Sequence, residues 1–323
     1  MKQYILLPCT AVASCLLAAC LMSSQQSAKT HPETPVMQQF SATPRFDHQQ
    51  TIFGQTFDLS RYDLHERFER ELTNICYTHN TTIQTLKRAN RFFPILEPIL
   101  REEGVPTDFL YLCCIESSLN TRAKSPAGAA GLWQFMPDTG RQYGLIVNDE
   151  IDERYNTIKA THAACRFFKD AYKRFGDWMA VAAAYNGGMG GLRSKLNAQQ
   201  ESRPMDLFLP EETSRYMFRI MAYKQLFADP YRFGFVLHSD QLYRPIRTTQ
   251  VTVSSSVASL TDFAKKNGTS YYQLKEFNPW LRDSRLTVRQ GQSFVIDIPL
   301  AEDMYYGADH PFPVYDTAWV VDK

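Results

Sequence analysis

The sequence has no excess of charge of either sign. Its 323 residues include 35 Lys and Arg against 34 Asp and Glu, which gives a formal net charge of +1 at pH 7. Proteins that hold nucleic acid through its phosphates concentrate positive charge. We therefore expect no nucleic-acid partner and no attraction to an anionic surface.

Cysteine is also scarce, with seven residues in the chain. Once the three in the N-terminal segment are set aside, four remain: Cys76, Cys113, Cys114 and Cys165. No pair of these has the spacing of zinc ligands and the His residues form no cluster, so we expect no metal and no cofactor. Cys113 and Cys114 are expected to be small core residues, and the disulfide state of all four stays open.

The N-terminal apolar run is too short for a membrane-spanning helix. It extends from Tyr4 to Leu17 and ends in Leu17-Ala18-Ala19-Cys20. This resembles a lipoprotein signal, in which residues 1–19 are removed and Cys20 is lipidated. Acyl chains would anchor the protein to a membrane without a spanning helix. We expect a periplasm-facing lipoprotein of the cell envelope, at the outer membrane because no Asp follows Cys20; a plain secretory signal is the alternative.

Residues 20–48 lack the spacing of apolar residues that marks folded elements. The stretch from Ser23 to Asp47 is rich in Ser, Gln, Thr, Pro and His. Such composition predicts a flexible tether, and its roughly 25 residues could extend to about 80 Å.

Glu116 is the acidic residue with the most informative surroundings. A helix-start signal at residues 106–108 precedes an apolar run of Phe109, Leu110, Leu112, Cys113 and Ile115. Glu116 stands at the end of this run. A carboxyl group held against apolar surface loses solvation, which raises its pKa and suits it to general acid catalysis near neutral pH. A solvated Glu at a helix end is the alternative.

Two further stretches predict a binding surface. Residues 123–137 are dense in Gly and Pro, which indicates a loop, and contain Trp133, Gln134 and Phe135. The aromatic rings could stack on sugars or fill the core, and Gln134 could hydrogen-bond a ligand. Residues 178–184 predict a closely packed helix, which Gly187 and Gly188 would end.

Taken in order, these stretches resemble the catalytic domain of the lytic transglycosylases of the soluble and membrane-bound D type. That family shares a Glu-Ser pair, a Gly-Leu-x-Gln-Phe/Ile-Met-Pro run, an Ala-Tyr-Asn-Gly-Gly run and a late Glu-Thr-x-x-Tyr. The matching segments are 116–117, 131–137, 184–188 and 212–216. One departure is Leu119, where the family usually has an aromatic residue.

The resemblance implies a mechanism with a single carboxylate. Glu116 would protonate the glycosidic oxygen between N-acetylmuramic acid and N-acetylglucosamine in peptidoglycan. It would then act as base toward the 6-hydroxyl of the same sugar, giving a 1,6-anhydro product. The implied neighbours of substrate are Ser118, Gln134, Tyr185, Asn186 and Tyr216.

Two other functions stay open at this stage. A water-using muramidase would need a second carboxylate, for which Asp138 or Asp149 lies nearby in sequence. A non-catalytic wall-binding protein is the other alternative, although Glu116 argues against it. Endo- or exo-cleavage, peptide-stem preference and oligomeric state are not predicted.

The C-terminal part predicts a different architecture. A strand at residues 250–253, helices opened by Ser259 and by the capping box Ser270-x-x-Gln273, and a strand through Phe294, Ile296 and Ile298 give the order β-α-α-β. This resembles a LysM module, which binds glycans containing N-acetylglucosamine. Ser254-Ser255-Ser256 replaces the usual Gly-Asp, so glycan binding is less secure than the fold.

The predicted whole is a mainly α-helical, lysozyme-like catalytic domain followed by a small βααβ LysM-like module. We expect an N-terminal helical extension at 49–93, the catalytic domain at 94–235, the module at 248–300 and a C-terminal tail at 301–323. A chain cut near Tyr243 is expected to fold without the module.

Overall fold

The fold was taken from a computed structural model of the chain, which describes residues 42–307 and 313–322. The predicted signal segment, Cys20 and most of the predicted tether lie outside the described residues. Almost all of the described chain belongs to one compact unit, residues 44–323. Within the described ranges, no helix has the length and apolar character needed to cross a membrane.

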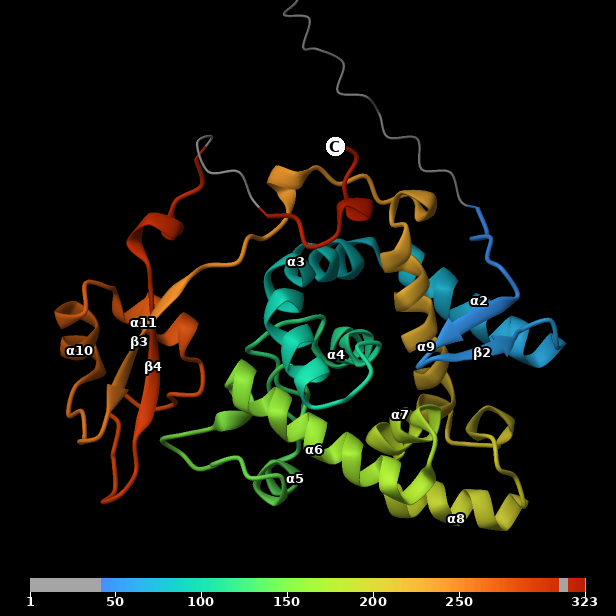
Figure 1. Cartoon of the computed structure of the whole chain (residues 1–323), viewed down its shortest axis with the longest axis horizontal. Helices are drawn as coiled ribbons and strands as arrows, with labels where there is room; N and C mark the ends of the chain where they lie inside the picture. The colour runs from blue at the N-terminus through green and yellow to red at the C-terminus, as the bar shows by residue number, and fades with distance from the viewer. Residues whose placement is uncertain (1–41, 308–312, 323) are drawn as a thin grey trace, which may run out of the picture. The chain divides into compact units, whose positions relative to one another are not determined.

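Helices dominate the chain as far as residue 228. They are α2 (Tyr62–Tyr77), α3 (His79–Glu102), α4 (Phe109–Ser117), α5 (Pro137–Gln142), α6 (Thr157–Phe175), α7 (Trp178–Gly187), α8 (Met189–Gln199) and α9 (Glu211–Ala228). Figure 1 shows α4 between α3 and α9. The predicted mainly α-helical class is confirmed.

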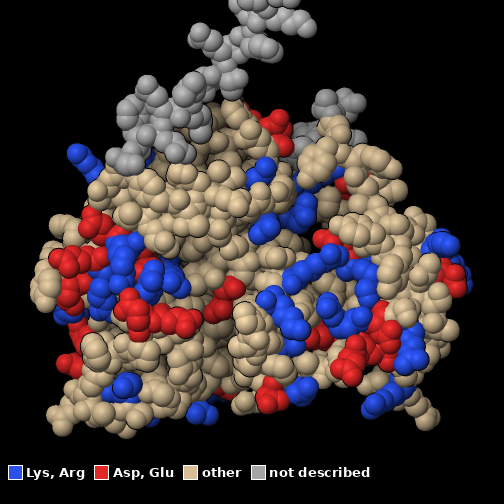
Figure 2. Space-filling view, turned by 180° about the vertical axis from the view of Figure 1, so that it is seen from behind, with Lys and Arg blue, Asp and Glu red and all other residues tan. Residues whose placement is uncertain are grey.

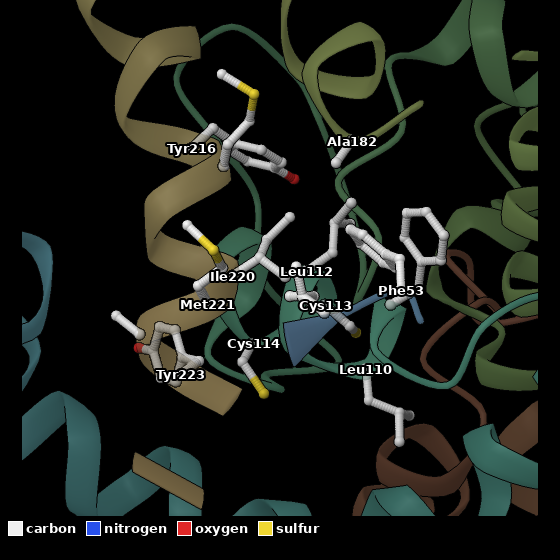
Figure 3. Close-up of a cluster of buried hydrophobic side chains, with 14 of the residues drawn as sticks. Phe53, Leu110, Leu112, Cys113, Cys114, Ala182, Tyr216, Ile220, Met221 and Tyr223 are labelled. Atoms are coloured by element: carbon white, nitrogen blue, oxygen red, sulfur yellow. The ribbon is translucent and has the colours of Figure 1, made fainter. Parts of the chain in front are cut away.

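Helix α4 is the centre of the main hydrophobic core. Its residues are apolar on most faces, and Leu112, Cys113 and Cys114 are accordingly all completely buried. Figure 3 shows Leu112 and Cys113 in one buried cluster with Tyr216 and Ile220 of α9 and Ala182 of α7, while Cys114 points toward Tyr223. The described cysteines are free thiols, so no disulfide stabilises this core. The small side chains of α7 allow its close approach, as its sequence predicts.

The N-terminal extension begins with a feature that the sequence analysis missed. Strands β1 (Gln49–Ile52) and β2 (Gln55–Asp58) form an antiparallel hairpin before α2. Asp108 fixes it: its carboxylate accepts the amide of Phe53 at 2.5 Å and pairs with Lys224 at 2.7 Å. Asp108 therefore precedes α4 as predicted, but its side chain does not cap that helix.

Helix α3 joins the extension to the catalytic region without a break. It runs through Pro94 and Pro98, so the backbone does not mark the boundary placed between residues 93 and 94. Buried Asn90 of this helix hydrogen-bonds Tyr243, Pro313 and Tyr315.

The predicted βααβ module is confirmed. Strand β3 (Thr248–Val253) pairs antiparallel with β4 (Phe294–Pro299), and α10 (Leu260–Lys266) and α11 (Tyr271–Phe277) lie between them in sequence. Ser259 caps α10, and Ser270 and Gln273 form the predicted capping box of α11. The local signals worked here because each cap satisfies backbone groups within one helical turn.

The C-terminal tail is part of the main core rather than a featureless end. Trp319 is 3% exposed, donates its indole N–H to the carbonyl of Phe227 at 2.8 Å, and packs against Phe93. The amide of Val321 bonds Leu237. A chain cut near Tyr243 would lose this packing, and the expectation that such a chain folds unaided stays a prediction.

Candidate functional site

Glu116 lies in the last turn of α4 and is half-buried. The hydroxyl of Tyr216, from α9, donates a hydrogen bond to its Oε1. Figure 3 shows the Tyr216 hydroxyl directed into the space between α9, α4 and α7. Among the described residues, no Lys or Arg lies within ion-pair distance of Glu116. The carboxyl group therefore has a hydrogen-bond donor but no neutralising cation.

Burial raises the pKa of Glu116 to about 7. The hydrogen bond from Tyr216 acts in the opposite direction because it stabilises the carboxylate, the negative charge of Glu212 raises the pKa further, and Arg219 lowers it. A carboxyl group with this pKa is protonated in a large fraction of molecules at neutral pH, which is what a general acid requires.

The chain turns sharply directly after Glu116. Ser118 and Leu119 both have left-handed backbone angles, with φ of 50° and 57°. Ser118 caps α4, and its carbonyl accepts a hydrogen bond from Arg88 of α3 at 3.1 Å. The turn leaves Ser118 next to the catalytic candidate, as predicted, while Leu119 is completely buried.

Residues 123–137 form the predicted loop, called here the substrate loop. Gln134 has a left-handed φ of 49°, and its amide nitrogen donates to the carbonyls of Gly131 at 2.7 Å and Ala123 at 3.3 Å. The loop itself therefore holds the Gln134 side chain through its amide nitrogen, and the amide oxygen takes no part in these two bonds. Trp133 is completely buried and donates to Thr161, so it fills the core and does not form a sugar-stacking face.

Helix α7 brings the third predicted stretch to the same region. The Tyr185 hydroxyl donates to the carbonyl of Trp133 at 2.6 Å and so ties α7 to the substrate loop. Asn186 is bonded on both ends of its amide: Thr213 donates to Oδ1 at 2.8 Å, and Nδ2 reaches Glu212 at 3.3 Å. Tyr185 and Asn186 therefore link the loop to the start of α9.

The two acids named as second-carboxylate candidates both lie at the protein surface. Asp138 is 98% exposed at the side chain and pairs with Arg141, and Asp149 is exposed. Glu212 is the acid whose charge acts on Glu116, and its carboxylate contacts Asn186. Within the described ranges, no three His, Cys, Asp or Glu residues are grouped to hold a metal ion.

Two buried charge clusters were missed by sequence reasoning. Glu71 of α2 is completely buried and pairs with Arg215 and Arg219 of α9. Arg154 is 6% exposed and pairs with Asp152. The arginine partners of Glu71 are far from it in the sequence, and Asp152, the partner of Arg154, lies in an irregular segment. No local spacing in the sequence therefore predicts either cluster.

The surface charges are mixed. On the face in Figure 2, acidic and basic side chains are interspersed, in line with the small net charge.

The comparisons with known proteins identify two domains. Residues 94–208 match the Transglycosylase SLT domain, and residues 249–302 match the soluble lytic transglycosylase C-terminal LysM-like domain. The predicted pairing of a lytic transglycosylase domain with a LysM-like module is confirmed.

Individual relatives cover only part of the chain. Membrane-bound lytic murein transglycosylase D of Escherichia coli K12 is 28% identical over 228 residues, 69% of this chain and 49% of that protein, and the protein of the same name from E. coli O6:H1 gives the same values. The chain spans about half the length of these curated relatives. The crystal structure of the 70 kDa soluble lytic transglycosylase of E. coli aligns over 55% of this chain and 30% of that one, with 21% identity and a TM-score of 0.37.

Proposed function

We propose that this chain, which carries a transglycosylase SLT domain followed by a LysM-like domain, is a peptidoglycan lytic transglycosylase. The observation that carries the proposal is Glu116, a carboxyl group whose pKa burial raises to about 7 and whose hydrogen-bond donor is Tyr216. The Glu116-Ser117 pair also resembles the Glu-Ser pair of the lytic transglycosylases, which supports Glu116 as the acid.

In the proposed reaction, one carboxyl group serves both proton transfers. Glu116 gives its proton to the oxygen that joins N-acetylmuramic acid to N-acetylglucosamine, and the bond from that oxygen to C1 of the muramic sugar breaks. The N-acetyl oxygen of the same sugar stabilises the positive charge at C1. The 6-hydroxyl oxygen then bonds C1 while the Glu116 carboxylate takes the proton of that hydroxyl, which restores the acid form of Glu116. No water is consumed, and the product ends in a 1,6-anhydro sugar.

The neighbouring side chains divide into groups that touch substrate and groups that hold the site. We propose that Ser118 and Gln134 contact the sugars. Ser118 lies next to Glu116, Gln134 lies in the substrate loop, and both have left-handed backbone angles. Tyr216 is proposed to keep the Glu116 carboxyl oriented. Tyr185 and Asn186 are proposed to border the bound glycan while fixing the substrate loop to α9.

The product distinguishes this function from hydrolysis. Purified sacculi digested with the protein should give muropeptides that end in 1,6-anhydromuramic acid, lighter by one water than hydrolysed ends in the mass spectrum. Reducing ends alone would favour the muramidase alternative, with Glu212 as the acid to test next because its charge already acts on Glu116. No released muropeptide would favour a wall-binding protein.

We further propose that the protein works in the cell envelope as a lipoprotein. The support is the Leu17-Ala18-Ala19-Cys20 sequence and the membrane-bound relative. Replacing the residue that would be lipidated, Cys20→Ala, should release the protein from the membrane fraction or leave its signal uncleaved. Unchanged membrane fractionation with the signal removed would count against the anchor.

A further inference from the structure

One buried arginine, Arg154, holds the substrate loop through hydrogen bonds to its backbone. Arg154 lies in a short 3₁₀ helix, Glu153–Tyr155, and its Nη1 donates to the carbonyls of Gly128 at 2.7 Å and Phe135 at 2.9 Å. These carbonyls stand near the two ends of the turn that contains Gln134. The guanidinium group therefore links two backbone segments of the loop. Without it, these segments would be held together only by the hydrogen bonds within the loop.

The orientation of Arg154 is itself fixed. Its Nε and Nη2 donate to the two carboxylate oxygens of Asp152 at 2.9 and 2.7 Å, and both side chains are buried. Such a two-point pairing sets the plane of the guanidinium group as well as its position. A lysine carries the same charge but cannot reproduce this geometry.

The backbone at Arg154 also touches the loop. Gly131 has a left-handed φ of 77°, and a Cβ atom at that position would lie 1.8 Å from the Arg154 carbonyl oxygen. The loop is therefore pressed against the 153–155 segment by backbone as well as by side chain. A displacement of this segment would move Gly131 and, with it, Gln134.

The 150–155 segment is in turn held by the C-terminal module. Backbone bonds run from Asp152 N to the Trp280 carbonyl and from Arg282 N to the Glu150 carbonyl, both at 2.9 Å. Between these two hydrogen bonds, Ile151 pairs with Leu281 in an isolated β-bridge.

Apolar packing continues this contact into the loop. The hydrophobic cluster of the module includes Ala130 of the substrate loop, together with Ile151 and Tyr155. The guanidinium group of Arg282 covers the Tyr155 ring at 4.5 Å. The core of the module is thus shared with the segment and loop that it supports.

We propose that Arg154 is a positioning residue for the substrate loop and that the C-terminal LysM-like module completes the catalytic site by holding the segment that carries it. The proposal rests on the proposed glycan-cleaving function for its kinetic consequence. It gives the module a role that does not depend on binding glycan.

The first test compares two arginines that each follow an aspartate by two residues. Arg154 is buried on the loop, whereas Arg285 pairs with Asp283 and is 65% exposed at the side chain. In the full-length protein, Arg154→Lys should lower kcat on soluble glycan oligomers by about 10- to 100-fold with a smaller change in KM, because a displacement of about 1 Å can cost this much. Arg285→Lys should leave kcat and KM unchanged.

The second test releases the module while leaving Arg154 in place. Ile151→Asp puts a charge in the contact with Leu281, where Ile151 is 5% exposed. Hydrogen exchange followed by mass spectrometry should show faster exchange at Asp152 and Arg282, whose amides cross the contact. It should also show faster exchange at Ala130 and Gly131, whose amides are bonded within the substrate loop.

The outcomes decide the two parts separately. An Ile151→Asp protein with exposed Asp152 and Arg282 amides but with wild-type loop exchange and kcat would overturn the role of the module. An Arg154→Lys protein with wild-type loop exchange and kcat would overturn the role of Arg154. If the wild-type protein cleaves no glycan, the proposed function fails, while the exchange measurements still decide whether the module holds the loop.

Discussion

Two carboxylates, Glu71 and the half-buried Glu116, contact neighbouring residues of helix α9, and their surroundings differ in kind. Glu71 is completely buried, and its carboxylate forms ion pairs with Arg215 at 2.7 Å and with Arg219 at 3.1 Å. Glu116 receives the hydroxyl of Tyr216. One turn of the same helix therefore supplies cations to the first carboxylate and a neutral donor to the second.

The difference separates a structural charge from a chemical one. A buried carboxylate with arginine partners links the helices that carry those partners. A buried carboxyl group without an ion-pair partner gains by keeping its proton, and the pKa of Glu116 accordingly rises to about 7. We infer that Glu71 orients α9 against α2, so that Tyr216 reaches Glu116.

The largest expected effect is the loss of activity in Glu116→Gln. The amide keeps the shape of the side chain but has no acidic proton, and loss of general acid catalysis lowers rates by roughly 10²–10⁴-fold. Release of soluble muropeptides from sacculi measures it. Circular dichroism of the variant serves as the folding control, and near wild-type digestion by a folded variant would contradict the assignment.

The same variant should be more stable than the wild type at alkaline pH. The pKa of Glu116 is raised from 4.5 to about 7 by folding, so its contribution to stability is fully present below pH 4.5 and is lost as the pH rises through 7. The loss amounts to about 3 kcal/mol. Urea denaturation at pH 8 should therefore favour Glu116→Gln, with the difference vanishing near pH 4.5; equal stabilities at pH 8 would mean that the carboxyl group is not penalised by burial.

Glu71→Gln should have the opposite sign. It removes the negative charge that three arginines, including Arg70, share, and a cost of about 2–3 kcal/mol in the free energy of unfolding is expected because these arginines are partly open to solvent. The same urea experiment measures it at neutral pH. A stabilising effect of Glu71→Gln would remove the contrast between the two sites.

The smallest effects concern the pH dependence of kcat. Activity should fall as Glu116 loses its proton, so the descending limb of the pH profile follows its pKa. Tyr216→Phe removes a hydrogen bond that lowers this pKa and should move the limb to higher pH, whereas Glu212→Gln removes a charge that raises it and should move the limb to lower pH. Shifts in the same direction would show that another group controls the limb.

Local sequence signals predicted the elements that local hydrogen bonds stabilise. The caps at Ser259 and Ser270 and the βααβ order of the module were all predicted and confirmed. The hairpin at residues 49–58 was missed because it lacks a strong apolar alternation and depends on Asp108, far along the chain. The roles proposed for Glu116 and its five neighbours remain predictions.

By itself, the sequence determined that a carboxyl group stands at the end of an apolar helix, that a Gly-rich loop and a small-residue helix accompany it, and that a LysM-like module comes later. These are properties of neighbouring residues. Only the tertiary structure decided that Tyr216, 100 residues away, contacts Glu116, that Arg154 holds the loop, and that Trp319 closes the core. The physical reason is that burial and pairing across such separations depend on how the helices pack, which no local spacing in the sequence records.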